Sequence, residues 1–123
     1  MASRRRRLSR SAEFERVYRQ GRSVGNRHLV VYAFPRGDAG GTGAPRLGVS
    51  VSRKVGGAVE RNRLKRLVRE AFHAAAPDLP GDHDVVVVAR PDARELAERE
   101  GLAGVRAALD DLLAQALGDG GAG

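Results

Sequence analysis

One amphipathic helix constrains the fold of this chain more than any other feature. Between Val59 and about Ala75, apolar residues recur every three or four positions, as in a helix with one face in a core. Pro77 and Pro80 end this pattern. The apolar positions are Leu64, Leu67, Val68, Ala71, Phe72 and Ala75. Such a helix requires a sheet or other helices to cover its apolar stripe.

The other half of this helix is cationic. Only Glu60 and Glu70 oppose its positive charges, and a basic turn with Gly56 and Gly57 precedes it. Like charges four residues apart destabilise an isolated helix by about 0.2–0.5 kcal/mol per pair, so we expect a polyanion to neutralise them. Guanidinium groups match the geometry of phosphate. The residues predicted to bind this polyanion are Arg53, Lys54, Arg61, Asn62, Arg63, Lys65, Arg66 and Arg69.

The charge distribution favours the same interpretation. The net charge is +7, and residues 1–70 carry 18 Lys and Arg against 5 Asp and Glu, whereas residues 71–123 carry 4 against 10. Positive charge concentrated in one part of a chain indicates nucleic acid or an acidic membrane surface as partner. The chain has no cysteine, which excludes disulfides and thiolate metal sites and fits a reducing cytoplasm.

The remaining patterns complete one α+β domain around a single sheet. Alternating or continuous apolar runs predict strands at residues 28–34, 46–52 and 85–89. Helical spacing predicts a short helix that ends at Gly21, a helical turn over residues 92–100 and a terminal helix from Leu102. We expect a flexible basic arm over residues 1–8, the domain over residues 9–117 and a disordered tail over residues 118–123.

The few aromatic residues suggest a second contact surface. Phe14 and Tyr18 share one face of the first predicted helix, and Tyr32 lies in a strand. One side of the second strand is small and polar, with Gly48, Ser50 and Ser52. A trough floored by small residues and edged by rings would accept unstacked bases. For each ring taken singly, packing in the core is the simpler explanation.

The residues give no sign of chemistry carried by the protein. His28, His73 and His83 lack the spacing of metal ligands, and no paired carboxylates, activated nucleophile or P-loop is present. Asp82-His83-Asp84 is explained by a polar turn that leads into the strand at Val85. We therefore predict no catalytic residue and no metal site in the protein.

Several blocks of sequence resemble the protein component of bacterial ribonuclease P. Arg61 to Glu70 is similar to the RNR signature helix of that family, and Leu47 to Gly56 is similar to the strand and turn before it. Phe14 to Tyr18 with Gly21, and Val85 to Pro91, extend the resemblance over about residues 8–117. Where Gly57 stands, the family commonly has Asn, so a side-chain cap of the helix is lost.

The resemblance implies an α-β-β-β-α-β-α sandwich with a left-handed crossover, a fold shared with a ribosomal protein domain. It also implies a catalytic RNA partner that removes the 5′ leader of precursor-tRNA, with magnesium ions held by the RNA and the substrate. The protein would contact this RNA through the RNR helix and hold the single-stranded leader in a cleft. By position, the cleft residues would be Phe14, Tyr18, Tyr32, Ser50, Ser52 and Lys54.

Three other classes compete with this interpretation. A ribosomal protein would bind folded RNA and stimulate no cleavage. A DNA-binding module is disfavoured because no heptad or second helix suggests a dimer. A membrane-surface protein is disfavoured because the cationic helix exposes no Trp or Phe. No apolar segment of a signal peptide follows Arg4 to Arg7, so we expect a cytoplasmic protein without a membrane or DNA partner.

Overall fold

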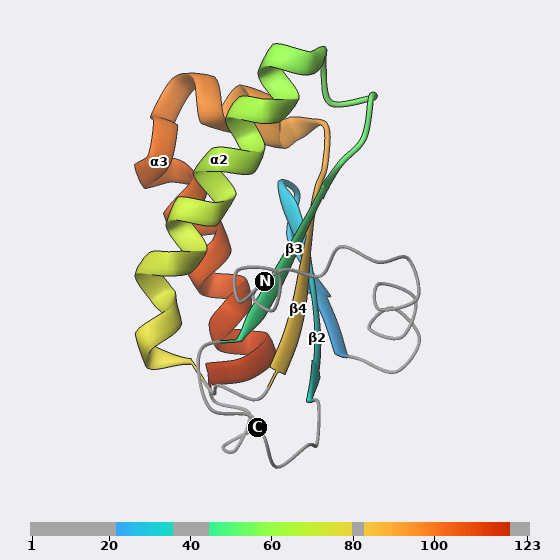
Figure 1. Cartoon of the computed structure of the whole chain (residues 1–123). Helices are drawn as coiled ribbons and strands as arrows, with labels where there is room; N and C mark the ends of the chain where they lie inside the picture. The colour runs from blue at the N-terminus through green and yellow to red at the C-terminus, as the bar shows by residue number, and fades with distance from the viewer. Residues whose placement is uncertain (1–21, 36–44, 80–82, 119–123) are drawn as a thin grey trace, which may run out of the picture.

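A computed structural model describes residues 22–35, 45–79 and 83–118. Four strands form one sheet: β1 (Arg22–Gly25), β2 (Leu29–Pro35), β3 (Arg46–Val51) and β4 (His83–Ala89). Two long helices, α2 (Ala58–Ala75) and α3 (Asp92–Leu113), lie together on one side of this sheet (Figure 1). Short helical turns, η2 (Ala76–Asp78) and η3 (Ala114–Gly118), follow them. The predicted α+β class is confirmed for the described residues.

The strand order in the sheet is β1-β2-β4-β3. β1 pairs with β2 and β2 with β4 in antiparallel orientation, whereas β3 pairs with β4 in parallel. A parallel pair needs a long crossover connection, which α2 supplies between β3 and β4. α2 packs against β3, and α3 packs against α2 and β2. α2 therefore lies over the β3 side of the sheet, with α3 beside it.

The hydrophobic core lies between the sheet and the two helices. Alternate strand residues face the helices, and Val31, Val85 and Val87 are 0% exposed. The buried residues of α2 are Leu64, Val68, Ala71 and Phe72, with Leu67 and Ala75 partly buried beside them. The buried positions of the last helical segment are Val105, Leu109, Leu112, Leu113, Ala116 and Leu117. The apolar stripe predicted for α2 and the amphipathic terminal helix predicted from Leu102 are thus confirmed.

α3 contains a kink at Gly101, where the backbone has a φ of 60° and a ψ of −146°. A positive φ of this kind favours glycine. The helical turn predicted at residues 92–100 and the terminal helix predicted from Leu102 are the two segments that meet there. The terminal helical turn continues to Gly118, which the sequence assigned to the tail.

The sequence reading missed β1 and its hairpin connection to β2. Asn26 forms this turn, because its Oδ1 accepts hydrogen bonds from the N–H groups of His28 and Leu29, both at 2.9 Å. Its Nδ2 donates to the carbonyl of Ala108 on α3 at 3.2 Å. The Gly25-Asn26 pair is the turn signal that marked this hairpin.

The prediction of a polar turn at residues 82–84 is wrong for His83 and Asp84. β4 begins at His83, and the side chain of Asp84 is fully buried in the strand. The reason is an ion pair across the sheet, described below. The first helix, the basic arm at residues 1–8, residues 119–123 of the predicted tail and Asp82 lie outside the described residues.

Candidate nucleic-acid interface

The charges of α2 are divided between its two sides. Arg61, Lys65 and Arg69 follow one another at four-residue spacing and so share one side, here called the cationic flank. Helical spacing places Glu60, Arg63 and Glu70 on the other side. That side faces α3, because a groove between the helices is lined by Glu60, Arg63, Leu64, Arg94, Ala97 and Glu98. The cationic flank therefore points away from α3 and carries no carboxylate.

The predicted RNA-binding residues of α2 differ in exposure. Asn62, Arg63 and Arg66 are exposed, whereas the three residues of the cationic flank are partly buried. The Nε of Arg61 is shielded from solvent and has no hydrogen-bond partner among the described residues. Long side chains that bury their stems keep their charged ends at the surface. Because the stems of Arg61, Lys65 and Arg69 are partly buried, the positions of their charged ends on the surface are restricted.

The turn before α2 presents two further cations. Val55 is 3% exposed and anchors the turn in the core, while Arg53 and Lys54 on the same turn are exposed. The N–H of Val55 donates to the carbonyl of Ser52 at 3.0 Å, and the N–H of Lys54 donates to the Ser52 hydroxyl at 3.3 Å. The turn is therefore ordered by its own backbone and holds both cations next to the start of α2.

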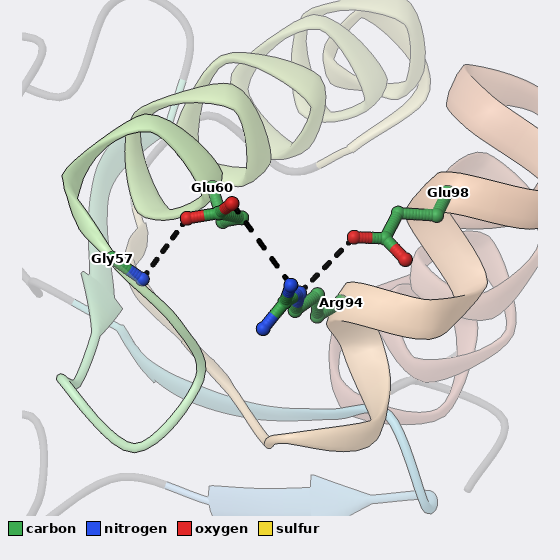
Figure 2. Close-up of polar contacts among 4 residues, drawn as sticks. All are labelled: Gly57, Glu60, Arg94 and Glu98. Atoms are coloured by element: carbon green, nitrogen blue, oxygen red, sulfur yellow. Dashed lines mark hydrogen bonds and ion pairs between the residues drawn. The ribbon is translucent and has the colours of Figure 1, made fainter.

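The N-cap residue of α2 is Gly57, and the side chain that caps the helix start is that of Glu60. Gly57 has no side chain, but its N–H donates to Glu60 Oε1 at 3.0 Å (Figure 2). Arg94 of α3 lies on the other side of this carboxylate, with its Nη2 3.9 Å from Glu60 Oε2. The Nε of Arg94 also donates to Glu98 Oε2 at 3.0 Å. The hydrogen bond to Glu98 and the attraction of Glu98 and Glu60 raise the pKa of Arg94 above its ordinary value.

The sheet face turned away from α2 and α3, here called the far face, carries the described part of the predicted cleft. Tyr32 on β2 pairs with Val86 on β4, and Ser50 on β3 pairs with Val88. Because β4 lies between β2 and β3, and Val86 and Val88 are two residues apart on it, Tyr32 and Ser50 are separated by two strand spacings of about 5 Å each across the sheet and by about 7 Å along it. Tyr32, Phe34 and Val88 pack against Val86, which is 0% exposed.

The predicted cleft residues are only partly brought together by the described structure. Tyr32 and Ser50 share the far face, and Ser52 and Lys54 follow the end of β3. Phe14 and Tyr18 lie outside the described residues. The sequence reading did not assign Val86 and Val88 to this surface. Their signal was the continuous apolar run at residues 85–89, which indicated two covered faces.

An ion pair joins β3 to β4 on the far face. Arg46 and Asp84 are register partners, and Arg46 Nε and Nη2 donate to Asp84 Oδ1 and Oδ2 at 2.7 and 2.8 Å. Bidentate pairs of this kind are the stronger charge-assisted hydrogen bonds. The Asp84 side chain is 0% exposed and that of Arg46 is 19% exposed. Asp84 is therefore a structural residue of the sheet.

Two further features bear on the class of protein. Within residues 22–35, 45–79 and 83–118, no three His, Asp or Glu side chains gather where they could share a metal ion. The helices of this same part of the chain are too short or too polar to span a bilayer. An α+β domain with a cationic helix, a basic turn and an aromatic side chain on the opposite sheet face has the surface chemistry of a nucleic-acid-binding protein.

The family described as Ribonuclease P matches residues 2–115 of the chain. The chain thus belongs to the bacterial ribonuclease P protein family, whose members are protein subunits of a ribonucleoprotein endoribonuclease of tRNA processing. This assignment decides against the ribosomal, DNA-binding and membrane-surface classes.

Similar proteins and structures agree with this assignment. The ribonuclease P protein component of Shouchella clausii is 44% identical over 110 residues, which are 89% of this chain and 84% of that protein. The structure of the Staphylococcus aureus RNase P protein is similar with a TM-score of 0.76 and 34% identity, over 90% of this chain and 94% of that one. The structure of the Thermotoga maritima RNase P protein is similar with a TM-score of 0.77 and 36% identity, over 89% of this chain and 96% of that one.

Proposed function

We propose that this chain binds the catalytic RNA of ribonuclease P through α2 and its basic turn, and holds the 5′ leader of precursor-tRNA on the far face. The RNA carries the chemistry of leader removal. The division of charge on α2 is the observation that supports this proposal most directly. A flank with three cations and no carboxylate, next to Arg53 and Lys54, suits a phosphate backbone.

The far face is the proposed site of the single-stranded leader. Tyr32 is partly buried beside Val86 and Val88, so its ring is held by packing. Aromatic rings bind unpaired bases by stacking, with little dependence on sequence. Phe14, Tyr18, Ser50, Ser52 and Lys54 complete the proposed cleft. Lys54 lies at the end of β3 next to α2, so it adjoins both proposed RNA sites.

Three finer points are part of the same proposal. The magnesium ions are held by the RNA and the substrate, and the protein acts in the cytoplasm, where both RNAs are found. The residues before β1 supply a first helix, which gives the order α-β-β-β-α-β-α. The connection from β3 through α2 to β4 is a left-handed crossover. Family membership is the support for all three.

Cleavage of precursor-tRNA by the catalytic RNA at low magnesium tests the function. We expect this protein to stimulate cleavage strongly when the substrate carries a 5′ leader, and less when the leader is shortened to one nucleotide. Stimulation that is equal for both substrates would contradict leader binding. Tight binding to the catalytic RNA without any stimulation would contradict the proposed role as a whole.

Tyr32→Ala tests the far face. Because stacking contributes about 1–3 kcal/mol per base, this variant should bind leader-bearing substrate at least about fivefold more weakly, measured with the assembled holoenzyme. Tyr32→Phe keeps the ring and is the matched control, so it should bind like the wild type. If Tyr32→Ala keeps full affinity for leader-bearing substrate, the leader does not bind at Tyr32.

A further inference from the structure

The backbone that leads into α2 is covered by two side chains from different helices. A Cβ on Gly56 would lie 3.0 Å from Glu60 Cβ and 3.5 Å from Arg94 Cδ. The side chains of Glu60 and Arg94 therefore fill the space beside Gly56, where a Cβ would lie, and the N–H of Gly57 donates to Glu60 Oε1. Arg94 of α3 thus packs onto the turn that carries Arg53 and Lys54.

Glu60 has two opposing effects at this place. Its carboxylate satisfies the N–H of Gly57, which has no side chain of its own to cap the helix. The same negative charge, next to a surface for phosphates, repels RNA. The side-chain nitrogen of Arg94 lies 3.9 Å from Glu60 Oε2, so Arg94 both orients this carboxylate and offsets its charge.

Arg94 is itself held in place. Its Nε donates to Glu98 Oε2 one helical turn later, at 3.0 Å (Figure 2). Glu98 thus fixes Arg94 on α3, Arg94 holds Glu60, and Glu60 holds the amide of Gly57. All three side chains are partly exposed, at 47% for Arg94, 37% for Glu60 and 49% for Glu98. Exposed ion pairs add little to global stability, so loss of Arg94 should act on local geometry.

We propose that Arg94 is a positioning residue for the RNA-binding surface, which holds Glu60 on the first turn of α2 and so fixes the turn bearing Arg53 and Lys54. Arg94 acts through Glu60 and does not contact the RNA. This inference rests on the proposed binding of the catalytic RNA by α2. It adds to that proposal a residue of α3 that lies outside the basic helix.

Binding of the catalytic RNA to the full chain tests this inference. Arg94→Ala should weaken binding about threefold to tenfold, the range expected when a helix cap is loosened. Arg99→Ala is the matched control. Arg99 is a 60% exposed cation on the same helix, and its Nη2 lies 3.9 Å from Glu100 Oε2. This control removes the same charge and should bind within about twofold of the wild type.

The salt dependence separates positioning from direct contact. A residue that touches a phosphate lowers the slope of log K against log salt by about 0.7–0.9 when it is removed. Arg94→Ala should leave this slope unchanged while affinity falls. A lower slope would show that Arg94 contacts the RNA and would overturn the inference.

A double-mutant cycle with Glu60→Ala tests the path of the effect. In the Glu60→Ala background, Arg94→Ala should weaken binding no further, because its partner is gone. Hydrogen exchange at the Gly57 amide should be faster in Arg94→Ala than in Arg99→Ala. If the effects of Glu60→Ala and Arg94→Ala on RNA binding add, or if Arg94→Ala and Arg99→Ala bind equally well, the positioning role of Arg94 is refuted while the proposed function stands. Failure of the wild type to bind the RNA would instead refute the proposed function.

Discussion

At the scale of single residues, Arg46 and Asp84 show how a buried charge is accommodated in the sheet. Asp84 is fully buried, and both of its oxygens accept hydrogen bonds from Arg46 on the neighbouring strand. Burial of an ion pair contributes little net stability, but removal of one partner leaves an uncompensated charge. The pair therefore fixes the register of β3 against β4 on the far face, along the strand that carries Ser50.

Asp84→Ala should lower the free energy of unfolding by about 3–5 kcal/mol, because it leaves the Arg46 guanidinium without its carboxylate. Asp84→Asn should cost less, since the amide oxygen still accepts a hydrogen bond. Urea denaturation measures both. The control is Asp92→Ala, which removes a 60% exposed carboxylate 3.9 Å from Arg27 and should change stability by less than about 0.5 kcal/mol. Equal losses in Asp84→Ala and Asp92→Ala would contradict a structural role of the buried pair.

At the scale of elements, α2 carries its packing residues and its proposed binding residues on different sides of one helix. Its apolar stripe faces the sheet, Glu60 and Arg63 face α3, and the cationic flank points away from α3. This arrangement keeps the carboxylates of α2 off the flank proposed to meet phosphates. The cost of like charges along the flank is offset only when an anion binds.

Arg61→Ala and Arg66→Ala should each weaken assembly with the catalytic RNA and lower the salt slope by about 0.7–0.9, if each residue contacts one phosphate. The measurement is a binding titration over a range of monovalent salt. Arg106→Ala, at an exposed cation of α3, is the control and should leave both quantities unchanged. A loss of affinity in Arg106→Ala as large as in Arg66→Ala would mean that overall charge, and not the helix, drives binding.

At the scale of the whole molecule, the two proposed RNA sites lie on opposite sides of the sheet. Arg66 is exposed on α2, which covers one face, and Tyr32 belongs to the far face. The hydrophobic core separates them. The turn at residues 52–57 lies where β3 ends and α2 begins, so it connects the two sites along the chain.

The effects of Arg66→Ala on RNA assembly and of Tyr32→Ala on substrate affinity should therefore be independent in the double variant. Residues more than about 7–10 Å apart without shared partners have free-energy effects that add within about 0.3–0.5 kcal/mol. Substrate affinity of holoenzymes assembled at saturating protein measures the Tyr32 effect, and titration of the RNA measures the Arg66 effect. A saturated holoenzyme of the double variant that binds substrate much more weakly than that of Tyr32→Ala alone would indicate one shared site.

Local sequence patterns were sufficient for α2, α3 and the strands β2 to β4, and for the buried side of each helix, but they missed β1. The spacing of apolar residues predicted the stripes of α2 and α3, and the cationic half of α2 was evident from the same spacing. The resemblance in the RNR block led to the family, which the comparisons confirm. Periodicity succeeds here because it depends on the geometry of one helix or strand at a time.

Only the tertiary structure decided which elements are neighbours. The order β1-β2-β4-β3, the pairing of Arg46 with Asp84 and the contact of Arg94 with Glu60 join residues far apart in the chain. Local sequence patterns do not identify these long-range contacts, because the buried face of a helix or strand predicted from spacing can pack against more than one other element. The sequence alone therefore places Asp84 in a turn and gives Arg94 no role, whereas packing brings Arg46 to Asp84 and Glu60 to Arg94.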